Sequence, residues 1–191
     1  MRNFAKVGEA DVSLIMSQLR LYPDLWDENT LRTKYPGTAH SQVSDIWVWF
    51  NNIVIPIIDE NQMELLKVGP GPINDKEVIP YRAWQLLPSV RPLIFNMMRQ
   101  QEAHRLGRVI ITRLPPGKRI DPHKDSGAPA TYFQRFQVAL QCLPGNSFRI
   151  ENEQVEFRTG DVWYIDNSKE HEVINNSEAD RIVMIVDMRS D

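Results

Sequence analysis

The chain has 191 residues, with 42% hydrophobic and 25% charged side chains, which favours a single globular domain spanning 1–191. No apolar run approaches the 18 or more residues that a membrane span needs, and the net charge of −3 is too evenly spread to favour a nucleic-acid partner. The lone Cys142 excludes a disulfide framework, and because the N-terminus lacks the apolar stretch of a signal peptide, we expect a cytoplasmic protein.

Residues 1–105 are predicted to form a helical or mixed buttress. The apolar spacing in "EADVSLIMSQL" (9–19) predicts a helix, and the aromatic and β-branched run 44–50 predicts a strand. Glycine and proline predict a loop over 69–75. Ser89 is the expected N-cap of a further helix. We expect these helices to pack outside the second half of the chain.

Residues 106–191 change to short strands separated by turns rich in proline, glycine and asparagine. The predicted strands are 108–114, 118–123, 132–141, 147–150, 153–158, 162–166, 170–175 and 181–188. Eight short strands at this spacing favour a double-sheet jelly roll or a related barrel. The expected fold is therefore mostly β, a double-stranded β-helix (jelly roll, cupin-like) buttressed by N-terminal helices.

One short motif in this half has the spacing of a metal chelate. In "DPHKDSG", His123 and Asp125 are two residues apart, and alternate residues of a strand face the same side. Non-haem iron(II) oxygenases bind their metal through two imidazoles and one carboxylate on one face. A His-x-Asp pair alone is weak support for such a site, so a distal histidine is needed.

His171 is the candidate for the third ligand. It follows Asp125 after four predicted strands, a separation that returns a jelly roll to the strand facing the first pair. The two remaining histidines have simpler interpretations. His104 suits the C-terminal end of a helix, and His40, after a turn, suits a surface or hydrogen-bonded position.

Arg181 begins the apolar strand "RIVMIVDM" ten positions after His171. An arginine on the face of Val183 and Ile185 is costly to bury unless an anion meets its guanidinium group, although at the start of a strand it could also emerge into water. With the His-x-Asp pair and the distal histidine in place, we favour an anion site. The segment from Arg113 to Arg135, rich in basic residues, points the same way.

Three runs of the second half carry a resemblance to a known family. They are "TRLPPGKRIDPHKDSG", "RFQVALQ" and "GDVWYIDNSKEHEVINNSEADRIVMIVDM". Together they resemble the aspartyl/asparaginyl β-hydroxylases, which are Fe(II)- and 2-oxoglutarate-dependent dioxygenases. The resemblance covers about the C-terminal 85 residues. It implies an enzyme that uses Fe(II), 2-oxoglutarate and O2 to hydroxylate a carbon of an amino-acid side chain, free or in a peptide.

The resemblance also assigns roles to individual residues. It implies His123, Asp125 and His171 as iron ligands, and Arg181 with Thr112 as partners of the far carboxylate of 2-oxoglutarate. Many relatives lack a carboxylate at the position of Asp125.

The next strand also departs from the family. Relatives tend to carry Arg-x-Arg-x-His there, whereas this chain has Phe133, Arg135 and Gln137 at the same alternation. Gln137 can donate to the cosubstrate carboxylate. Arg135 would orient a carboxylate or carboxamide of the substrate, and Phe133 would pack against an apolar portion.

Two other classes of function remain open from the sequence. One is a metal-dependent jelly-roll enzyme that does not use 2-oxoglutarate, against which Arg181 argues. The other is a non-catalytic binding module on the same scaffold, against which the three intact ligands argue. The substrate itself and the oligomeric state are not encoded in any pattern that we recognise.

Overall fold

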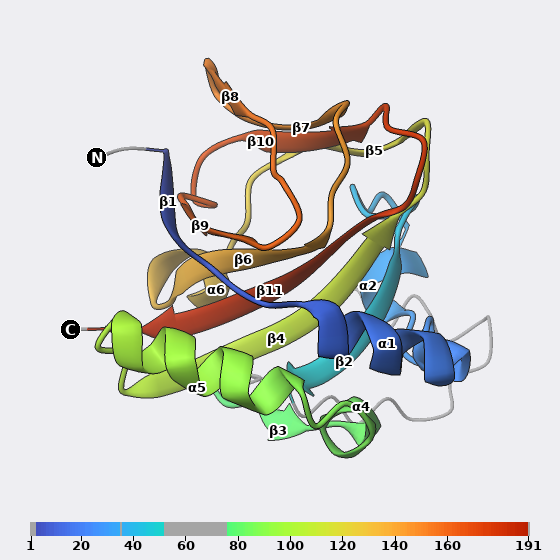
Figure 1. The fold of residues 1–191 in the computed structure, drawn as a ribbon. Coiled ribbons are helices and arrows are strands. Elements are labelled where there is room, and N and C mark those ends of the chain that lie inside the picture. The colour runs from blue at the N-terminus through green and yellow to red at the C-terminus, as the bar shows by residue number, and fades with distance from the viewer. Residues whose placement is uncertain (1–2, 35, 52–75, 191) are drawn as a thin grey trace.

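The computed structural model describes residues 3–34, 36–51 and 76–190, and the loop predicted over 69–75 lies outside them. Two antiparallel sheets face each other (Figure 1). The larger sheet has the strand order β1-β9-β6-β11-β4-β2-β3, and the smaller has the order β5-β10-β7-β8. The fold is therefore a mostly β jelly roll with helices on one side, as the sequence predicts.

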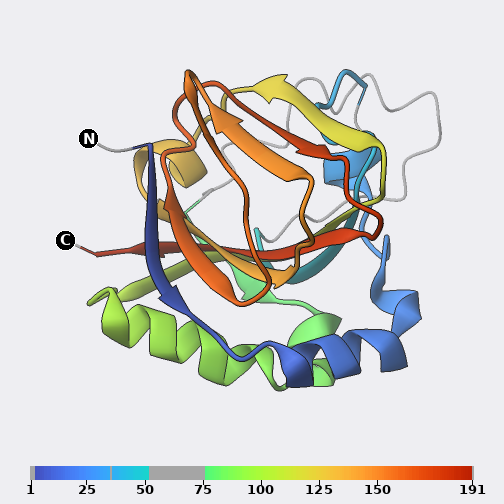
Figure 2. The ribbon, with the colours of Figure 1, turned by 45° about the horizontal axis from the view of Figure 1, so that its top comes forward.

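The larger sheet draws strands from both halves of the chain. Its strands are β1 (Phe4–Glu9), β2 (Ser44–Phe50), β3 (Ile79–Pro80), β4 (Arg105–Leu114), β6 (Gln134–Gln141), β9 (Asp161–Ile165) and β11 (Arg181–Arg189). The smaller sheet consists of β5 (Lys118–His123), β7 (Asn146–Ile150), β8 (Glu153–Val155) and β10 (His171–Asn175). Figure 2 shows the smaller sheet lying over the larger one.

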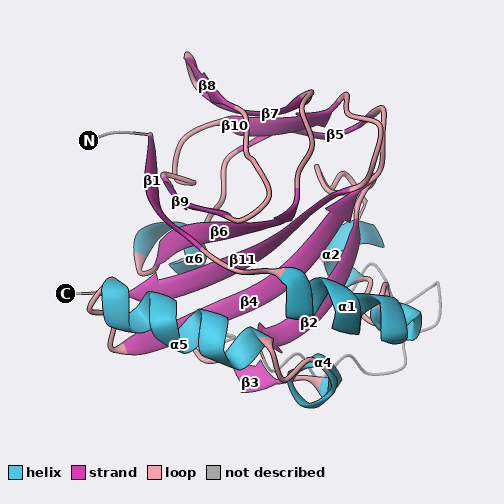
Figure 3. Ribbon diagram, viewed as in Figure 1, coloured by secondary structure: helices cyan, strands magenta, loops and turns pink. Residues whose placement is uncertain are grey.

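Helices α1 (Ser13–Leu21), α4 (Arg82–Leu86) and α5 (Val90–Gln100), with the 3-10 turn η1 (Pro23–Leu25), cover the outer face of the larger sheet (Figure 3). The short helix α2 (Leu31–Lys34) packs instead against the cluster between the two sheets, and α6 (Ala128–Thr131) follows in the second half. Helices α1 and α5 pack outside the larger sheet, as expected for the first half of the chain. Strands β1 and β2 of the same half instead belong to the larger sheet, where they pair with β9 and β4.

Strand β11 contributes side chains to both hydrophobic clusters of the fold. Its alternate residues Ile182, Met184 and Val186 belong to the cluster that packs against the helices. Val183 and Ile185 belong to a second cluster that lies between the two sheets. Because both faces of the strand are covered, its sequence is an almost continuous apolar run. Arg181 starts this run on the face that looks into the space between the sheets.

The predicted element boundaries hold closely, with two corrections. The strand predicted over 153–158 ends at Val155, and Phe157 beyond it is buried in the cluster between the sheets. Ser89 precedes α5 but does not cap it: its hydroxyl donates to Gln18 Oε1 at 2.5 Å and so ties α5 to α1. The eight strands predicted from residue 108 onward correspond to β4–β11.

No helix in the described part of the chain is long and apolar enough to cross a bilayer.

Candidate metal centre

The three predicted metal ligands meet at one end of the smaller sheet. His123 ends β5 and His171 begins β10, and the two are directly paired in the antiparallel register. Asp125 lies two residues beyond the end of β5, where its backbone N–H donates to the Asn167 carbonyl at 3.2 Å. Ligand atoms of all three residues lie within 4.8 Å of one another. Asp125 is thus placed by a loop contact and not by the alternation of a strand.

Both histidines are oriented for a metal. The Nδ1 of His123 lies 2.8 Å from the Asp121 carbonyl, and the Nδ1 of His171 lies 2.9 Å from the Lys169 carbonyl. Since a carbonyl only accepts, each Nδ1 must carry the hydrogen, which leaves the Nε2 lone pair free. The His123 Nε2 is buried without a hydrogen-bond partner. A metal ion would satisfy it, so these residues fit a divalent cation.

The protonation states suit metal binding near neutral pH. Burial lowers the pKa of His171 to about 4, so its imidazole is neutral. Burial would raise the pKa of Asp125, but the Arg135 guanidinium outweighs it and holds the pKa of that carboxyl well below its usual range. A neutral imidazole at His171 and an ionised carboxylate at Asp125 are the forms in which these side chains bind a metal.

Arg135 is held by carboxylates on both sides. Its Nε and Nη2 donate to the two carboxylate oxygens of Asp187 at 2.7 and 2.9 Å, and its Nη1 donates to Asp125 Oδ2. Burial lowers the pKa of Arg135, but the two carboxylates outweigh this effect and raise the pKa above its usual value. The residue predicted to hold the substrate therefore already has two acidic partners within the protein.

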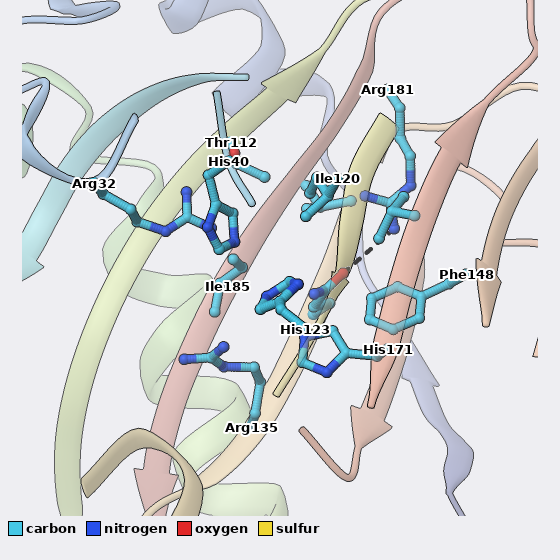
Figure 4. A pocket seen from close by; sticks show the side chains of 13 residues that line it. Arg32, His40, Thr112, Ile120, His123, Arg135, Phe148, His171, Arg181 and Ile185 are labelled. Atoms are coloured by element: carbon cyan, nitrogen blue, oxygen red, sulfur yellow. Dashed lines mark hydrogen bonds between the residues drawn. The ribbon is translucent and has the colours of Figure 1, made fainter. Parts of the chain in front are cut away.

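A cavity between the sheets, here called the inner cavity, extends from the two histidines to Arg181 (Figure 4). Arg181 is only 1% exposed, and no carboxylate lies within ion-pair distance of it among the described residues. Its Nη2 donates to Gln137 Oε1 over a long 3.4 Å, and its Nε is buried without a partner. The guanidinium carbon lies 5.1 Å from the Phe157 ring centroid. Burial lowers the pKa of Arg181.

Thr112 and Phe133 have surroundings that the sequence did not indicate. Thr112 lines the inner cavity, but its hydroxyl donates to Asp45 Oδ1 at 2.6 Å. Asp45 is fully buried and also accepts from Arg32 Nη1 at 2.6 Å. Phe133 is buried against Gly107, where an added Cβ would come within 3.0 Å of its ring, and it is not among the residues that line the inner cavity.

His40 is neither a surface residue nor one of the three candidate ligands. Its ring meets that of His123 edge to face, with centroids 4.7 Å apart, and it lines the inner cavity beside Arg32. Burial and the nearby Arg32 lower its pKa to about 2. The prediction that His40 is not a ligand agrees with the candidate ligand set, but no pattern in the sequence indicated that this half-buried ring lies beside His123.

A second cavity, here called the outer cavity, has a volume of about 230 Å3 and lies on the Asp125 side. Arg32, His40, Arg135 and Ile185 line both cavities and so form the partition between them. The outer cavity also carries Arg108 and Lys124. Metal ligands thus face both cavities: the histidines face the inner one, and Asp125 faces the outer one.

Comparisons with solved structures give weak similarity to part of the chain. Among solved structures, a predicted oxalate decarboxylase from Thermotoga maritima is 20% identical over 50% of this chain and 73% of that chain, with a TM-score of 0.35. A cupin domain from Bordetella pertussis is 20% identical over 44% of this chain and 81% of its own, also at a TM-score of 0.35. Comparison with curated proteins gives no significant match.

The family comparison is more specific. The model of the family described as aspartyl/asparaginyl beta-hydroxylase matches residues 73–191, which is more than half of the chain and includes all three candidate ligands and Arg181. Arg32, His40 and Asp45 lie outside the match. With this match over more than half of its length, the chain belongs to the aspartyl/asparaginyl β-hydroxylase family, and its three candidate ligands fit a metal ion.

Proposed function

We propose that the protein is an Fe(II)- and 2-oxoglutarate-dependent dioxygenase that hydroxylates a carbon of an amino-acid side chain, free or in a peptide. The observation that carries this proposal is the buried Arg181, which faces the metal centre across the inner cavity without a carboxylate partner in the described residues. An unpaired buried cation is costly, so a fold that keeps one needs an anion to meet it.

2-Oxoglutarate has the shape that these two ends of the cavity require. Its keto-acid end suits a metal held by His123, Asp125 and His171, and its far carboxylate suits the fork of a guanidinium. Gln137, which contacts Arg181 in the free protein, can donate its amide N–H to the same carboxylate. The inner cavity has a volume of only about 20 Å3, so the side chains that line it must shift to admit the cosubstrate.

When bound, the metal and 2-oxoglutarate supply the oxidation: one atom of O2 enters the substrate C–H bond, and the other enters succinate as CO2 leaves. The chain's own residues bind, orient and exclude water. Phe148 stacks on the His171 ring, with centroids 5.8 Å apart, and apolar side chains such as Val183 line the rest of the cavity. This lining limits the access of water to the reacting groups.

The outer cavity is the proposed substrate site. It adjoins Asp125, and its basic side chains Arg108 and Lys124 suit the carboxylate of an amino acid or an acidic side chain. Arg108 Nε donates to the neutral Asn51 side chain at 2.7 Å. The apolar residues Phe50 and Ile110 line the same space and suit an aliphatic portion. These residues take the substrate roles that the sequence suggested for Arg135 and Phe133.

The test is cosubstrate binding in the presence of a redox-inert divalent metal. Titration of the Mn2+-loaded protein with 2-oxoglutarate should show saturable binding and a concentration-dependent rise in melting temperature. Arg181→Met should weaken that binding at least tenfold. Arg149→Met, which removes a half-exposed cation from β7, is the matched control and should leave binding unchanged.

Absence of 2-oxoglutarate binding by the parent would favour a metal-dependent jelly-roll enzyme that does not use 2-oxoglutarate. Undiminished binding by Arg181→Met would instead overturn the role of Arg181. The substrate class has its own readout, the stimulation of succinate release by free amino acids and short peptides. If a nucleobase or a lipid gave the strongest stimulation, the amino-acid assignment would fail while the dioxygenase assignment stood.

A further inference from the structure

We propose that Arg135 is a positioning residue for the metal centre: it holds Asp125 by one carboxylate oxygen, so that only the other oxygen is presented to the metal. The proposal concerns metal binding alone and does not depend on the identity of cosubstrate or substrate. It is carried by the hydrogen bonds of three buried side chains, Arg135, Asp187 and Asn167.

The guanidinium group is fixed from the side away from the metal. Arg135 on β6 and Asp187 on β11 are directly paired in the larger sheet. Their side chains form a two-pronged contact, Nε to Oδ1 at 2.7 Å and Nη2 to Oδ2 at 2.9 Å, and Asp187 is fully buried. Such a fork fixes both the position and the plane of the guanidinium. The remaining nitrogen, Nη1, therefore points in a defined direction, toward Asp125.

One oxygen of Asp125 receives two donors. Arg135 Nη1 and Asn167 Nδ2 both donate to Oδ2, the latter at 2.7 Å. Asn167 is itself anchored, because its Nδ2 also reaches the Pro129 carbonyl at 3.1 Å and its own carbonyl accepts the Asp125 N–H. Oδ1 lies 3.6 Å from His123 Nε2 and thus faces the histidines.

This arrangement limits how the carboxylate can bind a metal. With Oδ2 occupied by two donors, Asp125 can offer Oδ1 but not both oxygens. A single-oxygen ligand together with two imidazoles uses one face of the ion and leaves the remaining positions open. A carboxylate that bound through both oxygens would occupy one more position. Asp187 also balances the charge of Arg135, so that the ligand carboxylate retains its own charge for the metal.

The test uses Co2+ alone, whose affinity can be measured by calorimetry and whose visible absorption reports the number of ligands. Arg135→Lys, which cannot form the fork, and Asn167→Ala, which removes one donor to Oδ2, should each lower Co2+ affinity about 10–100-fold. Each should also change the Co2+ absorption spectrum, which general destabilisation would not do.

Asp161→Asn is the matched control, because it breaks a mostly buried carboxylate's ion pair with Lys6, at 2.7 Å, outside the metal centre. It should lower stability and leave both Co2+ readouts unchanged. The double variant Arg135→Leu/Asp187→Leu leaves no unpaired charge at position 187, and Asp125 keeps its hydrogen bond from Asn167, which protects the test against misfolding. If the double variant and Asn167→Ala both bound Co2+ with the parent's affinity and spectrum, the proposal would be overturned.

Discussion

The two ends of the inner cavity each contain a buried arginine, and the two are held in opposite ways. At the metal end, Arg135 is 9% exposed and contacts two carboxylates, Asp187 and Asp125. At the end away from the metal ligands, here called the closed end, Arg181 is 1% exposed. It contacts the Gln137 amide at 3.4 Å and the face of the Phe157 ring, but no carboxylate among the described residues. The charge of Arg135 is therefore balanced within the protein, whereas the charge of Arg181 requires an anionic ligand.

The difference between the two arginines can be tested by replacing each with methionine and measuring the free energy of unfolding. Arg135→Met leaves the fully buried Asp187 without its ion-pair partner, which should cost about 3–5 kcal/mol in the free energy of unfolding. Arg181→Met removes a buried cation that has no ion-pair partner in the described residues and should stabilise the ligand-free protein by about 1 kcal/mol or more. Urea unfolding of metal-free, ligand-free samples measures both.

Equal destabilisation by the two substitutions would contradict the comparison. It would mean that the aromatic contacts of Arg181 with Phe157 and Phe148 compensate its burial as well as carboxylates do. Cation–π contacts of this kind contribute about 0.5–2 kcal/mol, which is less than the cost of burying a lone charge.

A second test is the pH dependence of the free energy of unfolding, to which His171 at the metal end contributes. His171 at the metal end has a pKa of about 4 in the fold, because it is buried, against about 6.5 when unfolded. Below pH 6.5 the unfolded chain therefore takes up a proton that the native protein does not, and stability is lost as pH falls toward 4. Between pH 7 and pH 5 this loss should reach about 2 kcal/mol. The lowered pKa of His40 acts in the same direction.

The check is the free energy of unfolding of the metal-free protein at pH 7 and pH 5. In His171→Gln the loss over this interval should shrink by about 2 kcal/mol. His104→Gln, which changes an exposed histidine outside the cavity, should follow the parent. If His171→Gln lost as much stability as the parent over this interval, His171 would take up its proton as readily in the fold as in the unfolded chain.

The strands of the second half are predictable from the sequence because proline, glycine and asparagine turns separate short apolar runs there. Arg181 also stands out, since a cation at the start of an apolar strand has few explanations. The pairing of Asp187 with Arg135 was not predicted, although the carboxylate within "RIVMIVDM" and the arginine within "RFQVALQ" are both in the sequence. Two opposite charges on two apolar strands are a signal for pairing, provided that the register is known.

Other site residues had no local signal at all. Asn167 contacts Asp125 across 42 positions of the chain, and Asp45 accepts from Thr112 across 67. Arg32 lines the cavity from α2, and His40 lines it from the segment after α2, where its ring meets that of His123. Such contacts depend on how the first half packs, and no periodicity or motif in that half specifies it.

The smallest expected effect concerns the hydroxyl of Thr112 at the closed end. In the free protein this hydroxyl donates to Asp45 Oδ1 at 2.6 Å, and Asp45 keeps Arg32 as a second partner. Thr112→Val should therefore lower the free energy of unfolding by about 1 kcal/mol and weaken 2-oxoglutarate binding by less than about threefold. Thr33→Val removes a buried hydroxyl that donates to the Thr30 carbonyl outside the cavity, and it is the matched control for stability. A tenfold loss of 2-oxoglutarate affinity with unchanged stability would reverse the conclusion. The hydroxyl would then leave Asp45 for the cosubstrate carboxylate, and the closed end would hold its ligand by two residues, Arg181 and Thr112, as the family resemblance implies.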